Sequence, residues 1–338
     1  MRFGIIGTGA IAGHHAACIN ELEGCELVGV SSTSGERARQ AEEKFGVRGY
    51  ANYQLMMEEA RPDIVCICTK SGSHLEPTQA AAALGIHVLS EKPLEVSLER
   101  ADLMISVCRE SGVQLGCIFQ NRFSPDYVQL KHAVDQGKLG KLLMGNAYIK
   151  WFRNDDYYKG SNWRGTLQGD GGAALINQGI HTIDLLLNVM GSVQDVFGQV
   201  RTMTHDIEGE DVGMAMLNFE NGAMGTIQGS TSFWPGYPER LEIFGEKGSV
   251  ILEAGKITAW NVQGMDSPVK PEQQDQGSGA SDPMAISHQL HLAQFRDFVS
   301  AVAAGRTPTV NGEEGRKALA LILAVYESSR RKEVLPVK

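Results

Sequence analysis

The chain has 338 residues, enough for two domains that each bury a core. Its formal net charge of −9 and its lack of any Lys/Arg cluster argue against a nucleic-acid partner. No run approaches the roughly 20 apolar residues that cross a bilayer, and glycines interrupt the N-terminal MRFGIIGTGAIAG where a signal peptide stays apolar. We therefore expect a cytoplasmic protein with no membrane partner.

The first part of the chain, residues 2–118, alternates short apolar runs with helical stretches such as 35–46 and 98–112. The apolar runs lie at 2–6, 26–30, 63–68, 86–90 and 113–119. This alternation is typical of βαβ units. It predicts an α/β domain over residues 1–120, with a doubly wound, Rossmann-type parallel sheet covered by helices on both faces. Cys66 and Cys68 share one strand face and are expected to be small core residues.

After about residue 120 the pattern changes to that of an α+β domain, which we expect to run from 121 to 338. Asn221 and Gly222 have the composition of a hairpin turn, so the runs around them predict a large, mainly antiparallel sheet. Residues 263–283 are polar and predict a long exposed loop. The other expected elements are a helix at 125–137, a strand at 142–152, a helix at 174–187, strands within 212–233 and 240–262, and helices at about 285–304 and 313–331.

The first strand leads directly into Gly7-Thr8-Gly9-Ala10-Ile11-Ala12 and a helix, which matches the pattern G-x-G-x-x-G/A in its required context. Gly7 permits a tight turn, and Gly9 allows the backbone to approach a pyrophosphate. Ala12 allows close packing at a helix N-terminus, where anions are favoured. A dinucleotide site is predicted, and the alternative is a turn that is merely rich in glycine.

The second strand ends in Ser31-Ser32-Thr33-Ser34, where an NAD-selective site usually places an acid on the ribose 2′-hydroxyl. Hydroxyl groups together with Arg37 would accept a 2′-phosphate. The cofactor is therefore expected to be NAD or NADP, with a slight preference for NADP. The alternative is that Arg37 is an ordinary solvated helix residue.

The fifth strand ends in Glu91-Lys92-Pro93. Ligands of doubly wound sheets bind beyond the carboxyl ends of the strands, so Lys92 is a candidate catalytic residue. A second candidate is the segment ALINQGIHTIDLLL, in which Asn177, His181 and Asp184 are spaced to line one stripe of an otherwise apolar helix. The alternative for His181 is a satisfied core histidine.

The loop before that helix is aromatic, polar and rich in glycine. Tyr157, Tyr158, Trp163 and Arg164 supply flat apolar faces and polar groups to a ligand that needs both, and Arg164 suits a carboxylate or phosphate. The alternative is an interface patch. Asn121 and Arg122, at the domain junction, are further substrate-binding candidates. No metal site is expected, because the adjacent His14 and His15 diverge and His288 and His291 lack neighbouring carboxylates.

Five segments in this order resemble the Gfo/Idh/MocA oxidoreductase family, namely GIIGTGAIAG, TKSGSH, SEKPLE, FQNRFSP and GGAALINQGIHTIDLLLNVMG. The resemblance implies a Rossmann domain followed by an α+β domain whose open sheet forms oligomer contacts, hence a homo-oligomer, dimer or tetramer. It also implies Lys92 and His181 as catalytic residues and a bond before Pro93 that is often cis.

The chain departs from the family at Asn177, where many relatives carry Asp. That amide can orient an imidazole but cannot stabilise its cation as an anion would, and Asp184 is a candidate for the missing charge, although a capping or interface role is equally open for it.

These observations define three sets of candidate residues. The catalytic set is Lys92, His181 and Asn177. The cofactor-binding set is Gly7, Gly9, Ala10, Ile11, Ala12, Ser31, Ser32, Arg37, Thr69, His74, Glu91 and Lys92. The substrate-binding set is Asn121, Arg122, Tyr157, Trp163, Arg164, Asn177 and Asp184.

The predicted function is an NAD(P)-dependent oxidoreductase that moves a hydride between the nicotinamide and a secondary hydroxyl or ketone of a sugar, sugar derivative or cyclitol. The hydroxyl proton would go to His181 or Lys92. Two alternatives are a glycoside-cleaving enzyme that uses transient oxidation by a bound nicotinamide and a non-catalytic NAD(P)-binding regulator. The presence of both Lys92 and His181 argues against the regulator.

Overall fold

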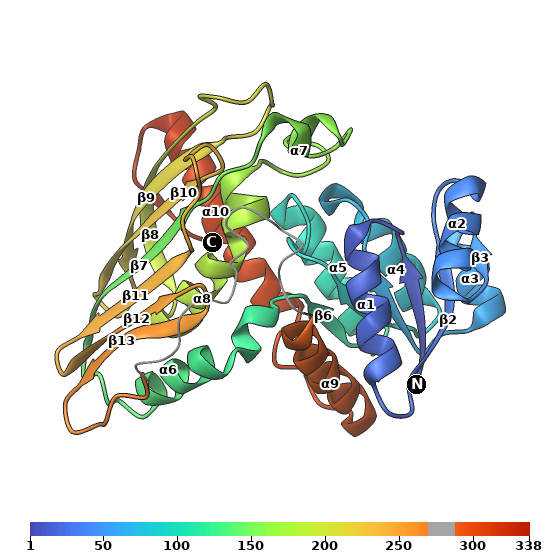
Figure 1. Ribbon diagram of the computed structural model, residues 1–338, viewed down its shortest axis with the longest axis horizontal. Coiled ribbons are helices and arrows are strands. Elements are labelled where there is room, and N and C mark those ends of the chain that lie inside the picture. Colours follow the sequence, from blue (N-terminus) through green and yellow to red (C-terminus); the bar gives the residue numbers. More distant parts are fainter. Residues whose placement is uncertain (270–287) are drawn as a thin grey trace. The chain divides into compact units, whose positions relative to one another are not determined.

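The computed structural model describes residues 1–269 and 288–338 and divides into two compact units (Figure 1). Unit 1 comprises Met1–Gln120 and Ser287–Arg316, and unit 2 comprises Asn121–Ile286 and Lys317–Lys338. The division after Gln120 lies where the sequence pattern changes. The expected uninterrupted second domain is not what the structure has, because Ser287–Arg316 returns to unit 1.

The physical reason for this return is helix α9 (Gln289–Ala304), whose apolar face belongs to the core of unit 1. Phe295 and Phe298 are almost fully buried in the same cluster as Phe3 and Ile5 of the first strand. The rings of Phe3 and Phe295 stack with their centroids 6.1 Å apart. The core of unit 1 is therefore completed by residues that come nearly 300 positions after its first strand.

Unit 1 contains a six-stranded parallel sheet in the order β3-β2-β1-β4-β5-β6, which confirms the predicted doubly wound fold. Its strands are β1 (Arg2–Ile6), β2 (Glu26–Ser31), β3 (Gly49–Tyr50), β4 (Ile64–Ile67), β5 (His87–Ser90) and β6 (Leu115–Cys117). Its helices, besides α9, are α1 (Ala10–Glu21), α2 (Gly35–Phe45), α3 (Tyr53–Ala60), α4 (Leu75–Ala83) and α5 (Leu98–Glu110). Cys66 and Cys68 are buried, as predicted for core residues, and burial raises the pKa of both thiols.

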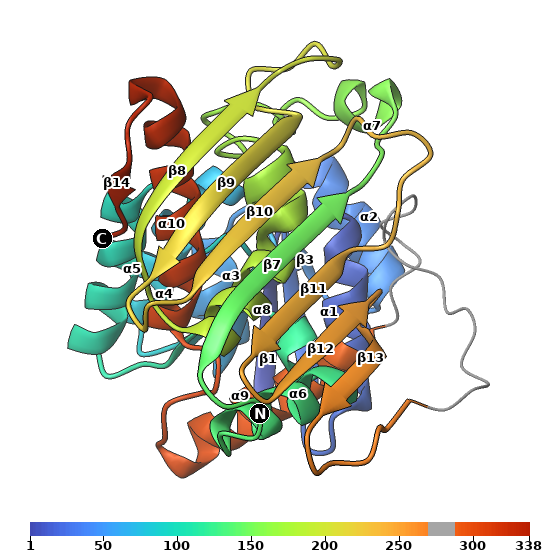
Figure 2. The same cartoon turned by 90° about the vertical axis from the view of Figure 1, so that its left-hand side faces the viewer.

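Unit 2 contains an eight-stranded sheet in the order β13-β12-β11-β7-β10-β9-β8-β14 (Figure 2). Only the pairing of β7 with β10 is parallel among these strands. The strands are β7 (Leu142–Lys150), β8 (Val193–Arg201), β9 (Val212–Phe219), β10 (Met224–Ser230), β11 (Arg240–Gly245), β12 (Gly248–Glu253), β13 (Lys256–Val262) and β14 (Leu335–Pro336). The helices are α6 (Pro125–Asp135), α7 (Asp155–Lys159), α8 (Ile180–Met190) and the part of α10 (Gly312–Arg331) that begins at Lys317.

The two faces of this sheet differ. Helix α8 packs on one face, where Leu186 and Met190 lie against Gly145 of β7. The other face carries exposed methionines, including Met214 and Met216 on alternate positions of β9. The predicted mainly antiparallel open sheet is thereby confirmed, and so is the turn at Asn221 and Gly222, which connects β9 to β10.

Some expectations from the sequence were incomplete. Strands β8 and β14 and helix α7 were not predicted as elements. Of the expected loop at 263–283, the part from residue 270 onward lies outside the described residues. Within the described ranges, none of the helices has both the length and the apolar character that a membrane crossing requires.

Candidate active site

The glycine-rich turn follows β1 and has the geometry that a dinucleotide requires. Gly7 has a φ of +100°, and a Cβ on it would lie 2.5 Å from the carbonyl oxygen of Cys68, so only glycine fits. A Cβ on Gly9, by contrast, would meet no atom of the described chain within 4 Å. Gly9 begins helix α1 without a side-chain cap from the described residues, and Ala12 is fully buried. The backbone N–H groups at the start of α1 are therefore open to an anion.

The hydroxyl groups at the end of β2 and in the segment after it differ in their surroundings. Ser31 is almost fully buried, and its Oγ has no hydrogen-bond partner among the described residues. Ser34 caps helix α2 by accepting a hydrogen bond of 3.3 Å from the backbone N–H of Arg37. The side chain of Arg37 is exposed. This geometry is compatible with both interpretations of Arg37.

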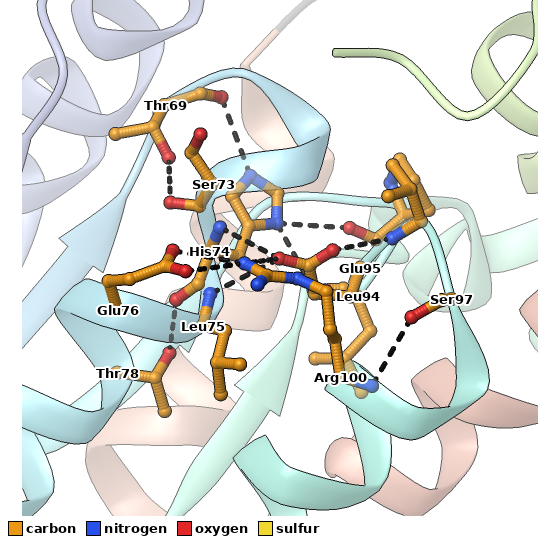
Figure 3. Close-up of polar contacts among 12 residues, drawn as sticks. Thr69, Ser73, His74, Leu75, Glu76, Thr78, Leu94, Glu95, Ser97 and Arg100 are labelled. Atoms are coloured by element: carbon orange, nitrogen blue, oxygen red, sulfur yellow. Dashed lines mark hydrogen bonds and ion pairs between the residues drawn. The ribbon is translucent and has the colours of Figure 1, made fainter. Parts of the chain in front are cut away.

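The loop after β5 carries Lys92, and the Lys92–Pro93 peptide bond is cis, as the family resemblance implied. His74 lies beside this loop (Figure 3) with its Nδ1 3.1 Å from the carbonyl oxygens of both Pro93 and Leu94. A carbonyl only accepts hydrogen bonds, so Nδ1 carries its proton. The ring of His74 is fully buried. The ring of His74 therefore holds the loop through these carbonyl oxygens, and a cofactor contact of His74 stays a prediction.

A buried carboxylate fixes the other end of the same loop. Glu95 accepts hydrogen bonds from the backbone N–H groups of His74 and Leu75, each at 3.3 Å, and from Arg100 at 2.8 Å (Figure 3). Arg100 also binds Glu76 at 2.9 Å. Glu95 thus joins the start of α4 to the lysine loop. Glu95 was not among the predicted site residues, and its sign in the sequence is an acid placed three residues after the candidate lysine.

Glu91 precedes Lys92 and is also buried. Its Oε1 lies 2.8 Å from Nε2 of His15, and its Oε2 accepts a hydrogen bond of 3.2 Å from the backbone N–H of Lys92. Burial alone would raise the pKa of this carboxyl. The hydrogen bond and charge of His15 and the charges of His291 and Lys92 outweigh burial and lower the pKa of Glu91 to about 2. Glu91 is therefore an anion at neutral pH.

In unit 2, the segment predicted as a regular helix begins with a wider turn. Ala174–Gly179 is a π-helix, and α8 starts only at Ile180. Glu210 stabilises this start by accepting the N–H groups of Ala173 at 3.0 Å and Leu175 at 2.7 Å. Asn177 therefore lies in the π-helical part of the expected helix, whereas His181 and Asp184 lie in its regular α-helical part. Turns of this kind occur frequently at functional sites.

Asn177 lies in the π-helix, and its side chain is held by the carboxylate of Asp170, which was not among the predicted site residues. Its Nδ2 donates to Oδ1 of Asp170 at 2.5 Å, and its Oδ1 accepts from Nε2 of Gln178 at 2.9 Å. Asp170 is almost fully buried and also accepts the N–H of Gly165. An anion therefore lies beside position 177 although the residue there is an amide. His181 follows on the first turn of α8 and is partly exposed.

Two of the predicted substrate-binding residues, Arg122 and Asp184, bind each other. Nε of Arg122 lies 2.8 Å from Oδ2 of Asp184, and Nη2 lies 2.6 Å from Oδ1. Both side chains are buried. The carboxylate of Asp184 is therefore held in a bidentate ion pair with the guanidinium of Arg122, and a substrate contact of either residue stays a prediction.

The aromatic loop connects to the π-helix through one glutamine. Nε2 of Gln178 donates to the hydroxyl of Tyr157 at 2.8 Å, and its Oε1 accepts from Arg153 at 2.7 Å. The guanidinium of Arg164 lies 4.3 Å from the centroid of the Tyr157 ring. Tyr157, Arg164 and Asn177 thus belong to one network, in which Arg153 and Gln178 are additional members.

The remaining candidates are less closely involved. The hydroxyl of Tyr158 bonds to Thr231, and Tyr158 is buried. Thr69 bonds to the carbonyl of Ser73 at the start of the turn that contains His74. In the part of the chain that the structure describes, no three His, Cys, Asp or Glu side chains gather in a way that would hold a metal ion.

Both parts of the chain match known protein families. Residues 1–119 match the model of an oxidoreductase family with an NAD-binding Rossmann fold, and residues 127–251 match that of the GFO/IDH/MocA C-terminal domain. A myo-inositol 2-dehydrogenase of Thermotoga maritima is 30% identical over 98% of this chain and 97% of its own length. An NAD(+)-dependent scyllo-inositol 2-dehydrogenase of Bacillus subtilis is 25% identical over 98% of this chain and 94% of its own.

One solved structure is similar over the full length. It is the WlbA dehydrogenase of Bordetella pertussis in complex with NADH and UDP-GlcNAcA, with a TM-score of 0.89 and 30% identity. The match covers 100% of this chain and 99% of that one.

Proposed function

This chain belongs to the GFO/IDH/MocA family of NAD-binding oxidoreductases, and from that premise we propose that it is a dehydrogenase of a sugar, sugar derivative or cyclitol. The observation that carries the proposal lies within unit 1. Lys92 follows β5 on a loop held by His74 and Glu95, in the same parallel sheet whose β1 ends in the glycine turn. The carboxyl ends of parallel strands share one edge of a sheet, where ligands of this fold bind.

The turn at the start of α1 fits the cofactor. Gly9 leaves open space where a side chain would otherwise stand, and the uncapped N–H groups of α1 suit a pyrophosphate. Residues 7–12 would hold the dinucleotide there. When bound, it supplies the acceptor for the hydride that leaves the carbinol carbon.

The chain's own residues would handle the proton and the developing charge. We assign the ammonium of Lys92 to stabilising the alkoxide as it forms. The hydroxyl proton passes to the neutral imidazole of His181 or, when the lysine is deprotonated before the reaction, to the amine of Lys92, which then becomes the ammonium. Asn177, fixed by Asp170 and Gln178, offers a positioned amide to a substrate hydroxyl. In this assignment Asp170 orients Asn177 and does not itself touch the substrate.

The substrate that we propose is a polyhydroxylated ring, and the aromatic loop of unit 2 carries side chains that suit such a ring. Tyr157 and Trp163 present aromatic faces, and Arg164 lies over the ring of Tyr157 with its charge available to an acidic group. The relatives named above act on inositols, and the WlbA complex contains a nucleotide sugar acid. Both kinds of compound belong to the class that we propose.

Cofactor choice follows from the end of β2. The described segment Ser31–Ser34 places no carboxylate there that would repel a 2′-phosphate. We propose that both NAD and NADP bind, with NADP at least as tight. The scyllo-inositol 2-dehydrogenase of Bacillus subtilis uses NAD and the WlbA complex contains NADH, a cofactor that lacks the extra phosphate.

The open face of the sheet in unit 2 is assigned to contacts between copies of the chain. Met144, Met216 and Met224 line a hollow on this face together with Phe197, and they are 36–61% exposed. An apolar surface of this kind marks an interaction site. We propose a homo-oligomer, dimer or tetramer, and a cytoplasmic location that suits the six free cysteines.

The experiment is a panel assay of the purified protein with NAD and with NADP. The panel contains myo-inositol, scyllo-inositol, free sugars, sugar acids and UDP-GlcNAcA, and NAD(P)H is followed by its absorbance. We expect net cofactor reduction with at least one compound. Cleavage of a glycoside without net reduction would favour the hydrolase, and cofactor binding without any turnover would favour the regulator.

A further inference from the structure

A buried cluster of imidazoles adjoins the lysine loop, and the reaction as proposed does not use it. It consists of His14 and His15 on α1, His291 on α9 and the carboxylate of Glu91, all in unit 1. His15 is fully buried and His291 is 5% exposed. Buried polar side chains at this density are costly unless they are paired, so the cluster calls for a physical reason.

The central contact is the hydrogen bond between His15 and Glu91. It is 2.8 Å long, and the carboxylate can only accept, so Nε2 of His15 carries the proton. The second oxygen of Glu91 accepts the backbone N–H of Lys92. One carboxylate therefore links helix α1 to the backbone of the candidate catalytic lysine.

Two rings of α9 pack beside His15. The edge of Phe295 lies against it with centroids 5.1 Å apart, and the ring of His291 lies at 6.2 Å. Burial lowers the pKa of His291 to about 4, so His291 is neutral at pH 7 and acts as a packing group beside His15. Nδ1 of His291 has no hydrogen-bond partner among the described residues, which agrees with that role.

The loop is thus clamped on both sides of Lys92. His15 acts through Glu91 on one side, and His74 holds the carbonyl oxygens of Pro93 and Leu94 on the other. Small displacements of a catalytic group cost rate, so a loop with such clamps keeps its lysine in one place.

We propose that His15 is a positioning residue for Lys92, acting through Glu91. The inference rests on the proposed function, in which Lys92 is catalytic. His15 also lies on the helix whose first residues would hold the dinucleotide. The same helix would therefore set the position of the cofactor at its start and that of the lysine loop one to two turns later, without any contact of His15 with either reactant.

The test compares His15→Phe, which keeps the ring volume, with His15→Gln, which keeps an N–H donor. The matched control is His291→Leu, which removes a buried imidazole of the same cluster that makes no contact with Glu91. Hydrogen–deuterium exchange of the peptide covering residues 91–97 needs no substrate. We expect exchange there to be about 10-fold faster in His15→Phe, since the clamp on the Lys92 N–H is lost. His15→Gln should restore slow exchange, and His291→Leu should not change it.

Kinetics supply the second readout, with whichever compound of the panel is turned over and with UDP-GlcNAcA and myo-inositol tried first. His15→Phe should lower kcat roughly 10- to 100-fold with little change in KM. In a Lys92→Met background the same substitution should have no further effect, because His15 acts only through that lysine.

Several outcomes would overturn the inference. Unchanged exchange at 91–97 in His15→Phe would do so, as would equal acceleration in every peptide of unit 1, which would indicate only a stability defect. If His15→Phe does not fold, His15→Gln alone tests the inference, and fast exchange of residues 91–97 in that variant would overturn it. If Lys92→Met keeps full turnover, the proposed function fails. If Lys92→Met is inactive while His15→Phe has normal kcat, only the positioning role fails.

Discussion

Asn177 donates its side-chain amide to Asp170 over 2.5 Å, inside a region where neither side chain has more than slight exposure. In the family that the sequence resembles, many members carry an acid at the position of Asn177. In this chain the neighbouring acid is Asp170, seven positions earlier. The negative charge of the site is therefore kept, but on a different residue.

This pairing makes Asn177→Asp a costly change. Two carboxylates at hydrogen-bond distance cannot both ionise, so the pKa of one of them should rise. A carboxyl whose folded pKa is raised stabilises the fold at low pH and loses that stabilisation as pH increases through the raised pKa. We expect Asn177→Asp to be less stable than wild type by about 1–3 kcal/mol at pH 8 and by less at pH 5.

Denaturant unfolding at both pH values would measure this difference. The control is the exchanged pair Asp170→Asn with Asn177→Asp, which restores one amide facing one carboxylate and should recover most of the stability. Equal stability of Asn177→Asp and wild type at pH 8 would show that the two side chains do not interact as described.

A second prediction concerns the reaction itself. Lys92→Met and His181→Asn should each bind NADH normally and lose about 10²- to 10⁴-fold in kcat, as expected for general acid–base groups. The double variant should lose less than the product of the single losses, since groups that serve one proton transfer are not additive. Steady-state kinetics and NADH fluorescence titration would measure both effects. The exposed Lys138→Met is a control that should keep full activity, and a Lys92→Met enzyme within about tenfold of wild type would contradict the assignment.

A third prediction concerns the choice of cofactor. Arg37→Ala should weaken NADP binding by about 1–3 kcal/mol and leave NAD binding unchanged, because only NADP has the 2′-phosphate that this guanidinium would bind. Calorimetry with both cofactors measures it. Arg39→Ala, an exposed substitution on the same helix, serves as the control. Equal losses for NAD and NADP, or a strong preference of the wild type for NAD, would refute the assignment.

The fourth prediction separates a substrate loop from an interface loop. Arg164→Ala should raise KM by roughly 10- to 100-fold for an acidic substrate, through loss of a charged hydrogen bond, with cofactor affinity unchanged. Arg164→Lys keeps the charge but not the planar group that stacks on Tyr157, and should show an intermediate effect. If kinetics remain at wild-type level while the oligomeric state by light scattering changes, the loop belongs to an interface.

The fifth prediction concerns acid. The folded pKa of His291 is about 4, below its ordinary 6.5, so its contribution to stability is fully present above pH 6.5 and is lost as pH falls toward 4. The pKa of Glu91 is lowered from 4.5 to about 2, so its contribution is lost below about pH 4.5.

His291→Leu should therefore remove the part of the stability loss between pH 6.5 and 4, a difference of about 3 kcal/mol at most. It should leave most of the part below pH 4.5, because His15 contributes more than His291 to the lowered pKa of Glu91. Urea unfolding at intervals between pH 7 and pH 4 is the measurement. Identical pH dependence of the variant and the wild type would mean that His291 takes up its proton in the folded state as easily as in the unfolded chain.

Much of the fold and part of the site could be predicted because local patterns determine them. The apolar runs of unit 1 specify parallel strands, and Gly7 and Gly9 specify the turn after β1. The π-helix could not be predicted in this way. It depends on Glu210, which binds the N–H groups of Ala173 and Leu175 from more than thirty positions away.

The roles of buried polar residues were the hardest to predict. The ion pair of Arg122 with Asp184 joins residues 62 positions apart, and sequence spacing gives no sign of it. His74 lies in one of the segments that resemble the family and is predicted to bind the cofactor, while its buried ring bonds to the backbone carbonyls of Pro93 and Leu94. A polar residue in an apolar segment is recognisably unusual in the sequence. Only its three-dimensional surroundings show whether it holds the backbone of the protein or binds a ligand.

The return of α9 to unit 1 has a consequence for biosynthesis. When the ribosome has made the first 120 residues, the nascent chain has every strand of the parallel sheet but not Phe295 and Phe298, which complete the core around Phe3. All of unit 2 up to β13 must emerge before those rings are available. The N-terminal unit therefore begins to form first and is finished late, and a fragment truncated at residue 120 leaves an apolar face of its sheet open to aggregation.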